Sequence, residues 1–275
     1  MSDSDCLPLT GPRIALLTLF AIATVCLIPL HWHFAGGAAW IACLILLARD
    51  SDRKLRLRIG VLLGCIAILG AADINSSTSN ANFLRVGIPF TLVILLPAII
   101  LGKWDSGTIR YRFWPKKWRK ADIFYTILSI PLSWAVLKFY WLATPEQFAQ
   151  WTLPPEPDDG EIKRLFIGIN MVGIWDELFF INTVFAILRR SFSFPVANLV
   201  QAVVYTSVLN DMAFIGIGPV IILIFAWTQG SMFEKSESLL WVLIVHLIVD
   251  FFLVAAIVQS YYPAYGLDYL WRHGF

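Results

Sequence analysis

The sequence contains few charged residues. Lys, Arg, Asp and Glu together make up 15% of its 275 residues, whereas soluble globular domains contain about a quarter. Hydrophobic residues make up 58% of the chain, and the mean hydropathy is +0.71. This shortage of charge excludes an ordinary soluble domain and predicts a polytopic membrane protein.

Cysteine and histidine are also scarce, with four of each. The cysteines show no CxxC spacing, and three of them lie within apolar stretches, where cysteine behaves as a small apolar residue. The sequence therefore predicts neither a disulfide framework nor a cysteine metal site. It also contains no nucleic-acid-binding motif, so we expect no nucleic acid among the partners.

Apolar stretches that resemble membrane spans occur at nine places. A full span needs about 20 apolar residues, so the short stretches 35–48 and 59–73 are the weakest candidates. The period-2 alternation of a membrane barrel is absent. We therefore expect an all-α transmembrane helix bundle with about eight to nine spans. The stretches are 13–33, 35–48, 59–73, 84–102, 122–144, 164–188, 195–213, 217–233 and 239–258.

Basic residues concentrate in alternate connections between these stretches, and the remaining connections are polar or acidic. With nine spans, all the basic connections fall on one side, which the positive-inside rule makes cytoplasmic. We expect an integral membrane protein with a cytoplasmic N-terminus, an outward C-terminus and membrane lipid around the basic loops. The basic connections are 49–58, 103–120 and 189–190, with Lys235 before the ninth stretch; the others include 74–82 and 145–161.

Ionisable residues inside the spans concentrate in residues 164–258. A charge at a helix centre costs about 2.5–3.5 kcal/mol on insertion scales, so such residues are functional candidates by default. Asp176 and Glu177 are adjacent, and His246 and Asp250 are four residues apart and share a helix face. The secondary candidates in the same region are Tyr205, Asn210 and Asp211.

This set of side chains suits several kinds of site. Acids and a histidine in one bundle can perform acid–base catalysis on water, bind a metal or relay protons. His246 with Asp250 could also be a structural hydrogen bond between helices, whereas two adjacent acids are harder to explain by packing. Gly173 would let a neighbouring helix approach close to Glu177.

The same region resembles the CPBP family, which comprises CAAX-prenyl proteases and bacteriocin-processing or immunity membrane proteins. The family motif E-E-x-x-x-R corresponds to DELFFI at 176–181, F-x-x-x-H corresponds to 205–209, and H-x-x-x-N/D corresponds to HLIVD at 246–250. Three positions depart from the family pattern. Asp176 replaces a glutamate, Ile181 replaces the arginine, and Leu209 replaces the second-motif histidine.

The resemblance implies a membrane-embedded helical endopeptidase that cleaves a membrane-bound or prenylated peptide. Glu177 would activate a water as general base, His246 and Asp250 would bind water or stabilise the oxyanion, and Asp176 would stand in for the family's first glutamate. The resemblance leaves open whether a divalent metal such as zinc binds at Glu177 and His246.

The predicted organisation is a peptidase-like core at 164–258, with scaffold helices at 1–163 and a tail at 259–275. Because the motifs depart from the family pattern, an inactive member that acts in immunity, maturation or partner binding remains the alternative. A proton-coupled transporter is less favoured, because the sequence shows no inverted repeat.

Overall fold

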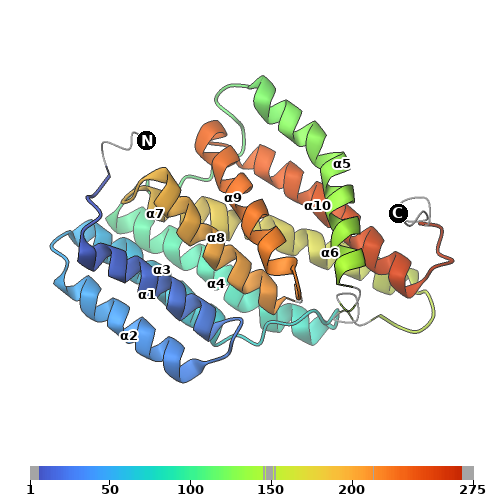
Figure 1. The fold of residues 1–275 in the computed structure, drawn as a ribbon, viewed down its shortest axis with the longest axis horizontal. Helices are drawn as coiled ribbons and strands as arrows, with labels where there is room; N and C mark the ends of the chain where they lie inside the picture. The colour runs from blue at the N-terminus through green and yellow to red at the C-terminus, as the bar shows by residue number, and fades with distance from the viewer. Residues whose placement is uncertain (1–5, 145, 147–150, 152, 213, 268–275) are drawn as a thin grey trace.

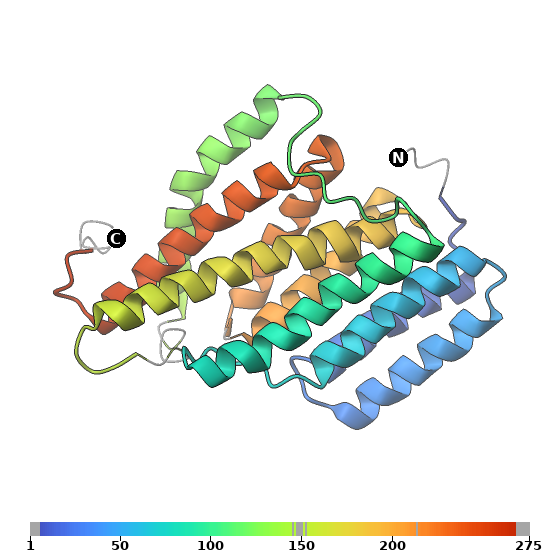
Figure 2. The same cartoon turned by 180° about the vertical axis from the view of Figure 1, so that it is seen from behind.

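The computed structural model describes residues 6–144, 146, 151, 153–212 and 214–267. Every element of more than one residue within them is helical, and the helices pack as one bundle (Figure 1, Figure 2). The elements are α1 (Gly11–Leu27), α2 (His33–Arg49), α3 (Arg53–Gly70), α4 (Asn80–Trp104), α5 (Lys120–Ala143), α6 (Asp159–Asp176), η3 (Glu177–Phe185), α7 (Ala186–Arg189), α8 (Phe194–Asp211), α9 (Gly218–Ser236) and α10 (Leu239–Tyr261).

These elements confirm the predicted all-α bundle. Each of the nine apolar stretches overlaps one helix, except that 164–188 falls on α6, η3 and α7, which run as one rod (Figure 2). Part of the connection 145–161 and residues 268–275 of the predicted tail lie outside the described residues. The division into scaffold and core stays a prediction.

Fewer helices than expected are long and apolar enough to cross a membrane. Within the described part of the chain there are four: α4, α5, the rod Asp159–Arg189, and α10. Helices α1 and α2 are apolar but shorter. The reason lies in composition: α3 begins with several cations, and α8 carries amides that are buried against other helices. The number of full spans therefore stays a prediction.

Short polar side chains mark where several helices begin. Asp52 accepts a hydrogen bond from the Leu55 backbone N–H at 2.7 Å, and Ser238 caps α10 by accepting from the Leu240 N–H at 3.2 Å. Such caps satisfy backbone donors that have no partner inside the helix. Both caps lie at the end of the bundle where the basic residues gather, in the first and last turns of helices and in the loops between them.

The predicted basic connections meet at one end of the bundle, which we call the basic end. Arg58 Nε donates to Asp105 Oδ2 at 2.7 Å, and Arg58 Nη1 donates to the Arg190 carbonyl at 3.0 Å. Arg112 Nη1 contacts Glu237 Oε2 at 2.9 Å. These bonds join four connections that are far apart in sequence, which confirms that the basic loops share one side.

The predicted polar connections meet at the other end, which we call the polar end. Arg164 Nη2 donates to the Thr78 carbonyl at 2.8 Å, and Thr78 Oγ1 donates to Glu161 Oε2 at 3.0 Å. The loop before α4 is thereby held against the start of α6. Which end faces the cytoplasm stays a prediction.

The rod of α6, η3 and α7 runs through the middle of the molecule. It contacts α4, α8, α9 and α10 and, through α7, also α3. Helix α3 packs on α4, α1 packs on α8, and α2 packs on α1 and α3. Helix α5 packs mainly on α10, on the side away from α1 to α3 (Figure 1). The rod is therefore enclosed where it carries the two adjacent acids.

Candidate active site

The acids lie where the rod changes its helical form. Asp176 is the last residue of α6, and Glu177 begins the π-helix η3. Thr183 Oγ1 donates to the Leu178 carbonyl five residues earlier, at 2.8 Å. All residues of η3 except Leu178 are buried. π-Helical segments are rare and often occur at functional sites.

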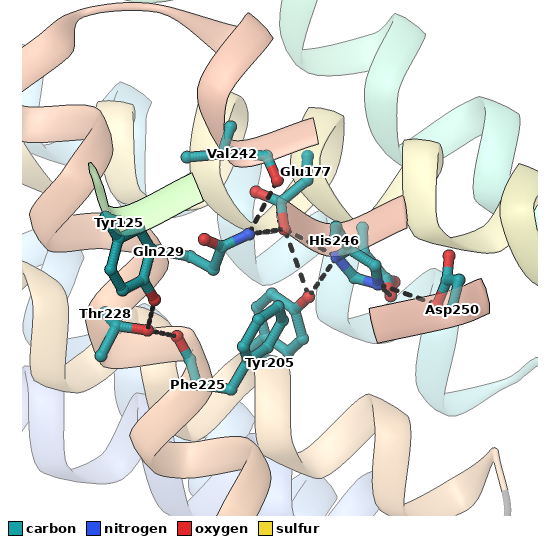
Figure 3. A network of polar contacts seen from close by, with 10 residues as sticks. Tyr125, Glu177, Tyr205, Phe225, Thr228, Gln229, Val242, His246 and Asp250 are labelled. Carbon is teal, nitrogen blue, oxygen red and sulfur yellow. Dashed lines mark hydrogen bonds and ion pairs between the residues drawn. The ribbon is translucent and has the colours of Figure 1, made fainter. Parts of the chain in front are cut away.

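Glu177 is the centre of a buried polar cluster (Figure 3). Its side chain is 0% exposed. Its Oε1 lies 2.8 Å from His246 Nδ1, 2.9 Å from Gln229 Nε2 and 3.4 Å from the Tyr205 hydroxyl. Hydrogen bonds to a carboxylate in a low-dielectric interior are strong, so this oxygen is held in place from three helices.

The His246 ring lies between carboxylates on both edges. Its Nδ1 contacts Glu177, while its Nε2 lies 3.6 Å from Asp176 Oδ2 and 3.5 Å from Asp250 Oδ1. The two distances at Nε2 exceed those of normal hydrogen bonds. All four primary candidates from the sequence therefore gather around one imidazole.

Gly173 allows this gathering. A Cβ atom added at Gly173 would lie 2.1 Å from Asp250 Oδ2 and 2.9 Å from His246 Cδ2. Only a residue without a side chain therefore lets α10 approach α6 at this point. The structure confirms the expected close approach, and its partner is the His246–Asp250 face of α10.

Of the three secondary candidates, the structure places one in the cluster and two outside it. Tyr205 belongs to the cluster, since its hydroxyl lies 3.0 Å from His246 Nδ1. Asn210 and Asp211 follow it by five and six residues at the end of α8, about 8–9 Å further along the axis. Asp211 Oδ1 instead lies 3.0 Å from His31 Nε2. The structure does not bring these two residues to the cluster.

Gln229 is the functional candidate that the sequence reasoning did not assign to the site. Its Nε2 donates both to Glu177 Oε1 and to the Val242 carbonyl, each at 2.9 Å, and its side chain is buried. The available signal was an amide in an otherwise apolar stretch. This amide ties the Glu177 carboxylate to the backbone of α10.

An apolar cavity of about 550 Å³ adjoins the cluster. Asp176, His246 and Asp250 lie in its wall, whereas Glu177 lies behind the imidazole and is not among the lining residues. The lining is mostly apolar and continues to the loop 75–78 at the polar end. Leu209 contributes an apolar side chain to this wall at the position of the second-motif histidine.

The residues that the structure describes offer few donors for a metal ion. They contain no group of three or more His, Cys, Asp or Glu side chains arranged to hold a metal ion. Oε1 of Glu177 already faces three hydrogen-bonding neighbours, and one imidazole with acids is a weak zinc set. A metal at Glu177 and His246 stays a prediction.

The fold and the site together define a membrane-embedded helical bundle with a buried acid–imidazole cluster beside an apolar cavity. Residues 160–252 match the family model of Type II CAAX prenyl endopeptidase Rce1-like proteins. This match confirms the resemblance to the CAAX-protease family for this part of the chain, and it supports a CAAX-protease-like function in general. Comparisons with curated proteins and with solved structures found no match.

Proposed function

We propose that the protein is an intramembrane endopeptidase of the CAAX-protease-like type, which hydrolyses a peptide bond of a membrane-bound or prenylated peptide. One observation carries the proposal: His246 is held by Glu177 on one edge and faces Asp176, Asp250 and the apolar cavity on the other. Such an arrangement supplies an oriented base at the wall of a largely apolar pocket.

The family resemblance assigns the general base to Glu177, but Glu177 does not line the cavity, so in the mechanism proposed here it acts on water through His246. Glu177 holds Nδ1, which directs Nε2 towards the cavity, so Nε2 takes a proton from a water bound near Asp176 and Asp250. The water oxygen adds to the substrate carbonyl carbon, and the proton then passes to the leaving amine as the C–N bond breaks. An imidazole oriented by a carboxylate performs this transfer in other hydrolases.

The surrounding residues position the pair. Gln229 and Tyr205 both direct donors at Glu177 Oε1, so the carboxylate needs little rearrangement when the imidazole gains charge. Fixed donors in a water-poor interior stabilise such charge better than water does. Gln229 and Tyr205 are therefore positioning residues, whereas Asp176, His246 and Asp250 reach the cavity.

The cavity suits a substrate with an apolar part. Pockets for small molecules and cofactors have volumes of about 300–1,000 Å³, and this one has about 550 Å³ with a mostly apolar lining. A prenyl chain or an apolar peptide segment would fill it and exclude bulk water. The reacting carbonyl would then lie at the acidic end of the cavity.

The test is cleavage of a prenylated reporter peptide by the full chain in lipid nanodiscs. Glu177→Gln and His246→Ala should each lower kcat by at least about 10²-fold, while Glu156→Gln and His33→Ala should retain cleavage, because both controls alter exposed residues. Thermal unfolding of each variant verifies its fold. Cleavage at the wild-type rate by a folded Glu177→Gln variant would overturn the proposal.

A chelator arm tests the metal. We expect cleavage to survive treatment with a strong chelator, because the mechanism above uses only protein groups. Activity that is lost with the chelator and restored by Zn²⁺ would instead assign a metal to Glu177 and His246. The proton-transfer role of the pair would then have to be revised.

A second candidate function is binding without catalysis. Its supporting observation is that Leu209 and Ile181 are apolar where the family motifs have His and Arg, and both are buried. A non-catalytic protein of this kind would act in maturation, immunity or partner binding. It would bind the prenylated reporter without cleaving it, and Glu177→Gln would leave its cellular phenotype unchanged.

A further inference from the structure

A second cavity, of about 270 Å³, lies at the basic end and has a different chemistry. Phe185 and Ala186 of the central rod form part of its wall. We call this cavity the basic pocket. Its five cationic residues are Arg110, Arg112, Lys116, Arg189 and Arg190.

Two glutamates balance only part of this charge. Glu234 Oε1 lies 2.9 Å from Arg189 Nη2, and Glu237 Oε2 lies 2.9 Å from Arg112 Nη1 and 2.7 Å from Lys116 Nζ. Five cations and two carboxylates therefore leave the pocket with an excess of positive charge. Such an excess in a concave site attracts anions.

Arg190 lies close to other positively charged side chains. Burial and the neighbouring cations Arg110 and Arg58 lower the pKa of Arg190. Repulsion between cations that the fold holds together is relieved when an anion binds among them. The positions of these cations therefore indicate a site for an anionic group.

Asn182 adds an unsatisfied amide to the pocket. Its side chain is 0% exposed and lines the pocket, and neither its Nδ2 nor its Oδ1 has a hydrogen-bond partner among the described residues. Buried polar groups without partners are rare and costly. A ligand with both acceptor oxygens and a hydroxyl donor would satisfy this amide fully.

The position of the pocket points to the membrane surface. Arg189 ends the candidate span Asp159–Arg189, so the pocket lies at the end of an apolar segment. The α4–α5 connection at this end exposes Trp114 and Trp118, at 64% and 63%. Aromatic residues gather at headgroup depth, and basic pockets between spanning helices bind anionic headgroups.

We propose that the basic pocket binds the phosphate of an anionic phospholipid with a hydroxyl-bearing headgroup, with Asn182 at its inner wall. Phosphatidylglycerol has this chemistry. Asn182 lies five residues after Glu177 in the same π-helix, so a bound headgroup would also stabilise the segment that carries the acid. The proposal does not rest on peptidase activity.

The experiment measures lipid binding to the full chain in detergent by native mass spectrometry and by the shift in Tm. Phosphatidylglycerol should bind and raise Tm, whereas phosphatidylcholine of the same chain length should not. The double variant Arg110→Gln/Arg112→Gln and, separately, Asn182→Leu should each weaken binding about tenfold or more. Arg85→Gln is the control, because Arg85 is exposed, pairs with Asp73 at 2.7 Å and lies near the start of α4, whereas the α4–α5 connection that lines the pocket follows the end of α4.

Three outcomes would overturn the proposal. The first is equal binding of phosphatidylcholine and phosphatidylglycerol, or equal weakening by the Arg85→Gln control. The second is stabilisation by inorganic phosphate with no preference for the phospholipid, which would assign a free anion. The third is displacement by a peptide with a free C-terminal carboxylate but not by its amide, with no lipid effect. If Asn182→Leu does not fold, lipid binding by the variant Arg110→Gln/Arg112→Gln still tests the proposal.

Discussion

Replacing Gly173 with alanine should separate α6 from α10 at the candidate site. The added Cβ would lie 2.1 Å from Asp250 Oδ2 and 2.9 Å from His246 Cδ2. Both atoms belong to short side chains on a packed helix, so the backbone of α10 has to move. Overpacking of this kind costs about 1–3 kcal/mol, and a misplacement of about 1 Å near reacting groups lowers the rate about 10²-fold.

A glycine-to-alanine change elsewhere in the bundle should have the opposite effect on Tm, which gives a control. An added Cβ at Gly64 in α3 meets nothing within 4 Å, and alanine is favoured over glycine inside a helix by up to about 1 kcal/mol. Gly64→Ala should therefore leave Tm unchanged or raise it, whereas Gly173→Ala should lower it by about 2 °C or more. The assays are thermal unfolding in detergent and cleavage of the prenylated reporter. Wild-type Tm and activity in Gly173→Ala would refute the close approach.

Three other outcomes are expected. Burial acts to raise the pKa of Asp105, but the hydrogen bonds from Arg58 and Thr108, together with the charges of Arg58 and Lys54, hold that pKa below its usual range. This stabilisation is present at neutral pH and is lost as the pH falls below about 4. Asp105→Asn should therefore lower the free energy of unfolding by about 2 kcal/mol at pH 7. It should also flatten the dependence of Tm on pH, measured by thermal scans. Tyr205→Phe should lower kcat about tenfold with little change in Tm, because it removes the hydroxyl that contacts Glu177 and His246 but keeps the packing of the ring; an unchanged kcat would contradict its positioning role. In a cysteine-free background, Lys117→Cys and Ser77→Cys should react with an impermeant maleimide from opposite sides of the membrane, with the former at the cytoplasmic face; labelling of both from one side would contradict the topology.

Much of the fold can be predicted from the sequence, because apolar stretches indicate helices within the membrane and basic connections indicate the loops on one side of it. The number of full spans is less predictable. Helices α8 and α9 carry amides such as Asn198 and Gln229, which are buried against other helices rather than exposed to lipid. Average apolarity therefore underestimates how deeply such helices are enclosed.

The acids and the histidine that the structure brings together can also be picked out from the sequence, because ionisable groups in apolar helices stand out. Adjacent residues point about 100° apart on a helix, yet Asp176 and Glu177 both reach His246, because an imidazole presents nitrogens on two edges. The π-helical form of η3 could not be predicted, since it depends on packing from several sides rather than on local propensity. Gln229 was missed because its contact with Glu177 depends on which helix lies opposite, and the sequence does not show this.

The separation of the acids and the imidazole on different helices has a consequence for biosynthesis. Glu177 and His246 are 69 residues apart, and chains grow at about 5–20 residues per second, so the histidine appears about 3–14 s after the glutamate. During that interval the nascent rod holds two carboxylates without their imidazole. Its final insertion is therefore expected to be coupled to the emergence of α10, and ribosome stalling between these segments should leave the rod poorly integrated.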